Sequence, residues 1–319
     1  MRHTRLPTIS LAIALLGVLG APISCNRSSA PAPTEPFVSA ATAREPCTCL
    51  FVGGDARDDR SHVVQWALRK AREQNACAFV FLGDMELNPQ LDVHFQKELA
   101  ELGQIPFYPV LGNHEVKLFG IFGIDRKEHV EKFKRRFLDN VHTPIKSELR
   151  DRVAYSVDLS GGVHFVALDN VAEPGFGKQQ LAWLRKDLTA ARANSATRHI
   201  VVGMHKALAA NGVTNHSMDE DGEIGKQDSA AALAIFRESR VDLVIASHLH
   251  TGISYVQGGI RSYITGGLGA PIARETPSGA DRRHHVLRMD FTDSSLNVTL
   301  LPFEGATVVA DKDEDEGKE

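Results

Sequence analysis

The sequence has few cysteines, little net charge and no long apolar run, and each scarcity narrows the range of functions. Only four cysteines occur in 319 residues, and the CxC pair at Cys47 and Cys49 has no second pair to complete a tetrahedral zinc site. The formal net charge is −4, and residues 311–319 alone carry six acids and two lysines, a charge of −4. The rest of the chain is therefore close to neutral and has no basic field for nucleic acid.

The main apolar run, at residues 9–19, is too short to span a membrane, which takes about 20 residues. Two arginines precede the run and a small-residue break follows it, which is typical of a secretory signal peptide. Cys25 then resembles the lipidation site of bacterial lipoproteins, with Ser24 before it and Pro22 where Leu is usual. We expect residues 1–24 to be a signal peptide. The exported product would reside in the periplasm or at the cell surface, either lipid-anchored at Cys25 or soluble.

Composition divides the remainder into three parts. Residues 25–46 are rich in Ser, Ala, Pro and Thr, cannot form a core, and are expected to be a disordered tether. Residues 47–303 are the predicted domain, and residues 304–319 are an acidic, disordered tail. In an oxidising compartment Cys77 is expected to pair with one cysteine of the CxC pair; the alternative is three buried free thiols.

From residue 49 onward, short β-branched runs alternate with helical patterns, an order typical of an α/β domain. Strands are expected at 50–53, 78–82, 106–111, 154–159, 163–168, 200–203, 243–246, 253–256, 262–264, 286–291 and 296–301. Helices are expected at 62–74, 91–102, 178–191 and 230–238. Residues 209–228 have low hydrophobicity, and their Gly, Asn and Asp content predicts a long loop.

Six residues of the metal-ligand type follow five of these predicted strands. They are Asp55, Asp84, Asn113, His205, His248 and His250. Because sites in open α/β sheets form at the carboxyl ends of strands, these side chains can converge on one crevice. Glycine precedes both Asp84 and Asn113, which suits a sharp turn that aims a side chain into that crevice.

Carboxylates, an amide oxygen and imidazoles form the mixed O and N donor set that suits Zn, Mn or Fe. Asp84 can bridge two ions with its two oxygens, and ions about 3.5–4 Å apart can hold a hydroxide and orient a phosphate. His248 and His250 are two residues apart, so an extended backbone would point them to opposite sides. Binding by both requires a loop conformation there, or one imidazole to each ion.

These residues stand in motifs that resemble the calcineurin-like metallophosphoesterase superfamily over about residues 50–301. The motifs are Gly83-Asp84, Gly112-Asn113-His114-Glu115, His205 and His248-Leu249-His250. Segments 180–184 and 263–267 look like the purple-acid-phosphatase-like branch. The resemblance implies an α/β fold with two facing mixed β-sheets flanked by helices, a four-layer α/β/β/α sandwich.

The resemblance also implies a role for each ligand-type residue. One ion would bind Asp55, Asp84 and His250, and the second would bind Asp84, Asn113, His205 and His248. His114 would stabilise the transition state or protonate the leaving oxygen. Glu115 is expected to support the ligands rather than to bind a metal itself.

Two positions depart from the family's pattern. Arg57 stands where most of the superfamily has a metal-binding His, and Leu87 stands where the purple acid phosphatases supply a Tyr. The first ion therefore lacks one protein ligand. Arg57 stays protonated and cannot bind a cation, so it either holds a phosphate oxygen or forms a structural salt bridge, for example with Asp58 or Asp59.

The sequence therefore predicts a metal-dependent phosphoester hydrolase with a dinuclear centre of Mn, Zn or Fe. Its expected substrates are small phosphomonoesters, attacked by metal-bound hydroxide, with Arg57 and His216 as candidate substrate contacts. One alternative is a phosphodiesterase or nuclease with the same centre. The other is a catalytically weakened cell-surface binding module. His164, within a predicted strand, is expected to be a hydrogen-bonded sheet residue instead.

Overall fold

The computed structural model describes residues 48–59, 61–85, 95, 97–116, 126–138, 145–149, 151–159 and 161–310. The chain divides into two units, Met1–Ala43 and Arg44–Glu319, and every described residue belongs to the second. The predicted signal peptide and tether lie outside the described residues, as do Cys25, Cys47, Leu87 and residues 311–319.

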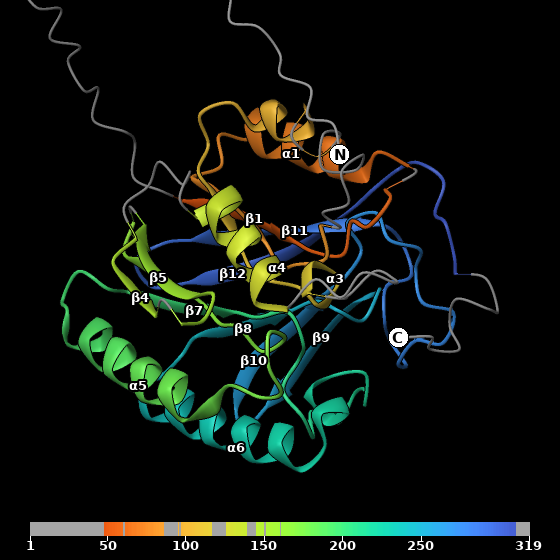
Figure 1. Ribbon diagram of the computed structural model, residues 1–319. Helices are drawn as coiled ribbons and strands as arrows, with labels where there is room; N and C mark the ends of the chain where they lie inside the picture. Colours follow the sequence, from red (N-terminus) through yellow and green to blue (C-terminus); the bar gives the residue numbers. More distant parts are fainter. Residues whose placement is uncertain are drawn as a thin grey trace, which may run out of the picture. The chain divides into compact units, whose positions relative to one another are not determined.

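One sheet has five strands, in the order β12-β11-β1-β2-β3 (Figure 1). Its strands are β1 (Cys49–Gly53), β2 (Ala78–Phe81), β3 (Phe107–Pro109), β11 (His285–Phe291) and β12 (Leu296–Pro302). β1, β2 and β3 are parallel, whereas β11 runs antiparallel to β1 and to β12. Helix α1 (Val63–Glu73) covers this sheet with a buried apolar stripe of Val63, Val64, Ala67, Leu68 and Ala71.

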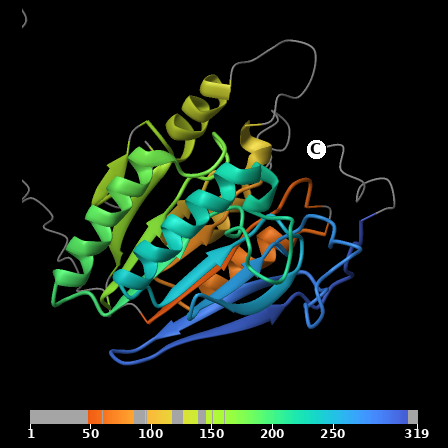
Figure 2. The ribbon, with the colours of Figure 1, turned by 90° about the horizontal axis from the view of Figure 1, so that it is seen from below.

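The other sheet has seven strands, in the order β4-β5-β6-β7-β8-β10-β9. Its strands are β4 (Ser147–Leu149), β5 (Ala154–Leu159), β6 (Val163–Ala167), β7 (His199–Gly203), β8 (Leu243–Ala246), β9 (Gly252–Gln257) and β10 (Ile260–Thr265). β6, β7, β8 and β10 are parallel, and the outer strands are antiparallel to their neighbours. Figure 2 shows α5 (Gly177–Ala193) and α6 (Gly222–Glu238) side by side across this sheet.

Short helical segments lie between these elements. They include η1 (Ala100–Leu102), α3 (Asn113–Val116), α4 (Arg126–Phe133), η2 (Lys134–Leu138) and η3 (Met218–Asp221). None of the helices among the described residues has the length and apolar character that crossing a membrane requires.

The two apolar clusters of the domain follow from strand alternation. In β7, Val201 belongs to the cluster that includes residues of both sheets, such as Phe51 of β1. Ile200 and Val202 point to the other face and pack in a second cluster with α5 and α6. Because successive side chains of a strand point to opposite faces, a fully buried strand serves both clusters at once. The predicted sandwich of two mixed sheets with outer helices is thus confirmed.

One predicted boundary is wrong. Helix α6 begins at Gly222 rather than at residue 230, so the second half of the predicted loop 209–228 is helical. The first turns contain Gly222 and Gly225. Because glycine lowers helix propensity, the sequence pattern did not predict a helix over these residues. Gly225 is needed there because a Cβ would lie 1.9 Å from the carbonyl oxygen of Met218. Tertiary packing, rather than propensity, fixes this end of the helix.

The structure gives the bonding state of two cysteines, Cys49 and Cys77. Cys77 is disulfide-bonded. Cys49 keeps a buried thiol, whose pKa is raised by burial. The partner of Cys77 therefore lies outside the described residues, and the alternative of three free thiols is wrong.

A buried imidazole joins β5, β6 and α5. His164 is 1% exposed, and its Nδ1 lies 2.6 Å from Asp158 Oδ1 and its Nε2 2.9 Å from Asp187 Oδ2. Ser156 donates to the other oxygen of Asp187 at 2.9 Å. The expected hydrogen-bonded sheet histidine is confirmed, in an unexpectedly acidic setting.

We expect the loss of stability in His164→Phe to depend on pH. Burial lowers the pKa of His164, but the bonds to Asp187 and Asp158 outweigh it and raise the pKa above its usual value. A raised folded-state pKa gives stability that is fully present below the unfolded value of about 6.5 and is lost as pH rises through the folded pKa. The variant should therefore lose about 1–3 kcal/mol at pH 6 and less at pH 9, measured by urea unfolding. Equal losses at both pH values would contradict a charged ring.

Candidate metal centre

The candidate centre lies where strands of both sheets end. Asp55 follows β1 and Asp84 follows β2, whereas His205 follows β7. Backbone hydrogen bonds connect the first two loops: Asp55 N–H donates to the Gly83 carbonyl at 3.0 Å, and Ala56 N–H donates to the Asp84 carbonyl at 3.0 Å. The strand ends expected from the sequence therefore do meet.

Three of the ligand-type residues have a left-handed backbone. The φ angles are 60° at Asp55, 60° at Asp84 and 70° at His248. Positive φ is uncommon outside glycine, although Asp and His adopt it more often than most residues, and it concentrates at functional sites. The turn at His248 also removes the difficulty of the His-x-His spacing, because the backbone there is not extended.

Gly112 allows the loops after β2 and β3 to touch. A Cβ at this position would lie 2.2 Å from the backbone nitrogen of Asp84 and 2.3 Å from its Oδ1. It would also lie 2.7 Å from Glu115 Oε2. Only glycine brings the two loops this close, which is the physical reason for a glycine before Asn113.

The first donor group joins Asp55 and His250. Ser247 Oγ and the His248 backbone N–H, at 2.8 Å, both donate to Asp55 Oδ2. Asp55 Oδ1 is buried, accepts no hydrogen bond, and lies 3.7 Å from His250 Nε2. Because His250 Nδ1 donates to the Pro271 carbonyl at 2.9 Å, the lone pair of the neutral ring is at Nε2. Two acceptors that face each other at this distance suit a shared cation.

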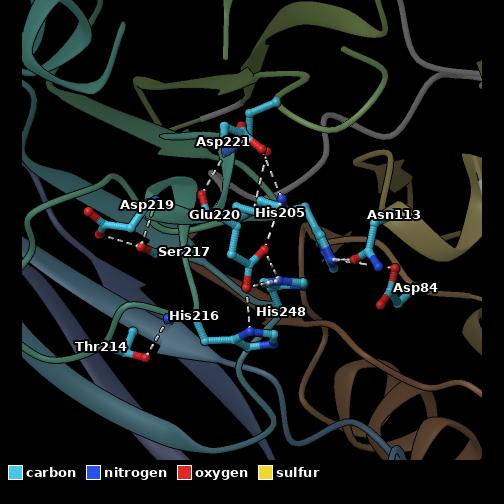
Figure 3. A network of polar contacts seen from close by, with 12 residues as sticks. Asp84, Asn113, His205, Thr214, His216, Ser217, Asp219, Glu220, Asp221 and His248 are labelled. Carbon is cyan, nitrogen blue, oxygen red and sulfur yellow. Dashed lines mark hydrogen bonds and ion pairs between the residues drawn. The ribbon is translucent and has the colours of Figure 1, made fainter. Parts of the chain in front are cut away.

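The second donor group joins Asp84, Asn113 and His205 (Figure 3). His205 Nδ1 lies 2.7 Å from the Leu82 carbonyl oxygen, which places the lone pair of the neutral ring at Nε2. Nε2 in turn lies 2.7 Å from Asn113 Oδ1 and 3.4 Å from Asp84 Oδ1. His205 is fully buried, whereas Asn113 is half-buried.

His248 and His250 belong to different groups. Donor atoms of Asp84, His205 and His248 lie within 4.8 Å of one another, as do those of Asp55, Asp84 and His250. Asp84 is the member that both groups share. Burial lowers the pKa of both histidines, that of His248 to well below its usual range, which keeps the rings neutral and able to bind a cation.

Glu115 supports the centre from behind, as expected. Its Oε2 accepts from the backbone N–H groups of Asp84 at 2.9 Å and Gly112 at 2.8 Å, and its Oε1 accepts from that of Met85 at 2.6 Å. Burial and the negative charge of Asp84 raise the pKa of Glu115 to about 7. These three contacts are to backbone N–H groups of two loops, so Glu115 holds the two loops together.

The three remaining sequence candidates surround the two groups. His114 is 7% exposed, and its Nε2 lies 3.8 Å from Asp84 Oδ2. Arg57 is half-buried, and its positive charge is close enough to contribute to the lowered pKa of His250, which burial chiefly causes. His216 stacks on the ring of His248 with centroids 4.0 Å apart.

Two contacts of the centre were not foreseen from the sequence. Glu220 lies with both oxygens 3.1 and 3.3 Å from His248 Nε2, and Lys206 Nζ lies 3.0 Å from Glu220 Oε2. The sequence gives a weak indication that Lys206 lies near the centre, because it directly follows His205. Nothing in the sequence connects Glu220 with a histidine 28 residues further on.

Comparison with known proteins agrees with this geometry. The family model described as calcineurin-like phosphoesterase matches residues 51–252. That span holds all six of the ligand-type residues at the strand ends. No curated protein sequence matches the chain.

Several solved structures share the fold at low identity. A purple acid phosphatase from yellow lupin (Lupinus luteus) seeds is 14% identical with a TM-score of 0.59, covering 80% of this chain and 51% of that one. The chain thus spans about half the length of the lupin protein. A dimetal phosphatase from Danio rerio is 15% identical with a TM-score of 0.59, covering 80% and 96%.

A third structure with this fold is described as an anchor. GAP50, the anchor in the inner membrane complex of Plasmodium, is 11% identical with a TM-score of 0.59, covering 83% of this chain and 88% of that one. At these identities the three structures establish a common fold and nothing finer. Taken with the family model, which matches well over half of the chain, they lead to one conclusion: the protein belongs to the calcineurin-like phosphoesterase family.

Proposed function

We propose that the protein is a metal-dependent phosphoester hydrolase that acts on small phosphomonoesters. One observation carries the proposal: two groups of donor atoms share Asp84 at the strand ends of both sheets, and among their residues all but His250 are buried. The lupin and Danio rerio proteins of the same fold, both described as phosphatases, support the choice of reaction. The near-neutral body of the chain favours small substrates over long nucleic acids.

In this proposal Asp55, Asp84 and His250 hold one ion, and Asp84, Asn113, His205 and His248 hold the other. Two ions bound there would supply a nucleophile at neutral pH and neutralise the charge of the phosphoryl group. The chain's own contribution is alignment. Glu115 bonds to the backbone of the loops that carry Asp84 and Asn113, and His114, 3.8 Å from Asp84, would give a proton to the leaving oxygen.

Metal analysis and a substrate panel test this proposal together. Purified protein is expected to approach two Mn, Zn or Fe ions per chain, and to hydrolyse p-nitrophenyl phosphate faster than bis-p-nitrophenyl phosphate. A reversed preference would make the protein a diesterase with the same centre. Absence of metal, with no activity after addition of Mn, Zn or Fe, would contradict hydrolysis altogether.

The second candidate function is a binding module without hydrolysis. The observation that favours it is Arg57, which occupies a position where most of the superfamily has a metal-binding His. GAP50 from Plasmodium has the same fold and is described as an anchor, which is not a catalytic role. Five of the six ligand-type residues form two converging groups, and Asn113 Oδ1 lies 2.7 Å from His205 Nε2, which favours the enzyme.

Arg57→Ala is expected to raise the Michaelis constant about 10-fold while turnover and metal content stay near wild type. A guanidinium holds phosphate with two parallel hydrogen bonds, and losing it removes binding that the ground state and the transition state share. Steady-state kinetics with p-nitrophenyl phosphate measure the effect. Arg57→Lys is the matched variant and should recover only part of the affinity. A fall in metal content or in thermal stability instead would make Arg57 a structural residue.

Export and lipid anchoring at Cys25 are part of the same proposal. They are supported by the arginines, apolar run and small residues of the first 25 positions. A centre outside the cell would act on extracellular or periplasmic phosphate esters.

A further inference from the structure

Glu220 stands behind the candidate centre, on the short helix η3. Its carboxylate contacts the ring nitrogens of two histidines: His248 Nε2 at 3.1 and 3.3 Å, and His216 Nδ1. Figure 3 shows the carboxylate directed at both rings. Lys206 Nζ completes its surroundings at 3.0 Å. Three cationic or N–H groups therefore converge on one carboxylate.

These contacts determine which nitrogen of His248 remains for the centre. A neutral imidazole has one N–H and one lone pair, and a carboxylate at Nε2 selects the tautomer that carries its proton there. The lone pair is then at Nδ1. His248 belongs to one donor group with Asp84 and His205, and its ring is 5.0 Å from that of His205.

The ring of His248 is held on other sides as well. Its backbone N–H donates to Asp55 Oδ2 at 2.8 Å, and His216 stacks on its face with an interplanar angle of 16°. With the ring plane held by stacking, the remaining freedom is a half-turn about the Cβ–Cγ bond, which would move Nε2 away from Glu220. The contact with Glu220 restricts that rotation.

The segment that carries Glu220 is itself firmly attached. Met218 is fully buried, and its backbone N–H donates to the Ala207 carbonyl at 2.9 Å. Ser217 caps η3, and its hydroxyl donates to Asp219 at 2.8 Å. Because Lys206 follows His205 directly, its contact with Glu220 ties this segment to a second histidine of the centre.

Glu220, His216 and His248 also form a trio that could hold a cation of their own. Lys206 argues against that use, because an ammonium group 3.0 Å from Glu220 Oε2 already neutralises the carboxylate and would repel a metal ion. Glu220 has two contacts with His248, one with His216 and one with Lys206. A carboxylate that orients a metal-binding histidine fits all four.

We propose that Glu220 is a positioning residue: it accepts the Nε2–H of His248 and thereby aims Nδ1 of that ring at the ion shared with Asp84, Asn113 and His205. This inference rests on the proposed metal centre. Lys206 and His216 hold Glu220 in place, so residues 206–220 contribute to the affinity for one of the two ions.

The test uses the whole chain with Zn(II) and ¹⁵N-labelled histidine. In Glu220→Gln the side chain keeps its size but loses its charge. The dissociation constant of one ion, measured in competition with a chelator, should then rise about 10-fold. In Glu220→Ala the same constant should rise by about 10- to 100-fold. The other ion should keep its affinity within about twofold. In the wild-type protein, the ¹⁵N spectrum should show His248 bound through Nδ1 with a proton on Nε2.

Glu223→Gln is the matched control, because Glu223 is exposed on the first turn of α6 and accepts from Gln227 Nε2 at 3.0 Å. It should bind both ions as the wild type does. Unchanged affinity in Glu220→Gln, or equal loss of both ions, would overturn the positioning role. So would a third bound ion with His248 bound through Nε2. A wild-type chain that takes up no Zn(II) would overturn the centre itself and, with it, this inference.

Discussion

Replacing Asp84 with asparagine is expected to reduce metal content to fewer than one ion per chain and turnover by about 10³-fold or more. Asp84 belongs to both donor groups, so its charge serves both ions. Asparagine keeps an oxygen that can accept the His114 backbone N–H, now bonded to Asp84 Oδ1 at 2.9 Å. The loop should therefore keep its shape while the negative charge and the second oxygen are lost. Metal analysis and single-substrate kinetics measure both effects.

The matched control for this change is Asp242→Asn. Asp242 accepts the Ile200 N–H at 2.8 Å and contacts Arg192 at 3.2 Å, at the beginning of β7 and β8 rather than at their carboxyl ends. Its substitution should leave metal content and turnover unchanged, even if stability falls somewhat. An Asp84→Asn protein that retains both ions would show that the two groups do not share this carboxylate.

The sheets and the meeting of strand ends could be predicted from the sequence, because buried strands leave a strong signal. Runs such as 50–53 and 243–246 are continuous and apolar, and both occur as strands within a residue of their predicted bounds. Once the strands are known, the carboxyl-end rule brings Asp55 and Asp84 to one edge of the five-stranded sheet. His205 follows a strand of the other sheet, so its meeting with them depends on how the two sheets pack.

Other features left no such signal. The three residues of β4 (Ser147–Leu149) and the four of α3 (Asn113–Val116) are too short for a hydrophobic period to show. Glu220 is one of several acids between 219 and 223, and only the tertiary fold selects it for the contact with His248. The local hydrophobic pattern of the sequence determines which helices and strands form. Contacts between loops, such as that of Glu220 with His248, depend instead on how those helices and strands pack.

The two proposed ion sites differ in how fully the chain supplies them. One has the donors of Asp84, Asn113, His205 and His248, with Glu220 behind the last. The other has Asp55, Asp84 and His250, and Arg57 in the place of a further ligand. A cationic guanidinium beside this second set opposes a metal ion and attracts a phosphate oxygen. In the proposed centre one ion site would therefore be well supplied, and the other would be weaker and nearer to the charge of Arg57.

His114→Ala is expected to lower turnover by about 10²- to 10⁴-fold while metal content stays at the wild-type level. The backbone N–H of residue 114, which orients Asp84 Oδ1, is kept in the variant. The ring itself lies 3.8 Å from Asp84 Oδ2, beside the donor groups rather than within either of them. Turnover under saturating substrate and metal analysis on the same sample separate the two effects; unchanged turnover would remove His114 from the mechanism.

The leaving group distinguishes the two roles that His114 can have. If the ring protonates the leaving oxygen, the defect of His114→Ala should be small for p-nitrophenyl phosphate, whose leaving group needs no proton, and large for an alkyl phosphate, whose alkoxide does. If the ring instead stabilises the transferring phosphoryl oxygens, the defect should be the same for both substrates, because those oxygens are common to them. His114 Nε2 lies beside Asp84 and outside both donor groups, so the substitution can change the chemistry without removing a metal ligand.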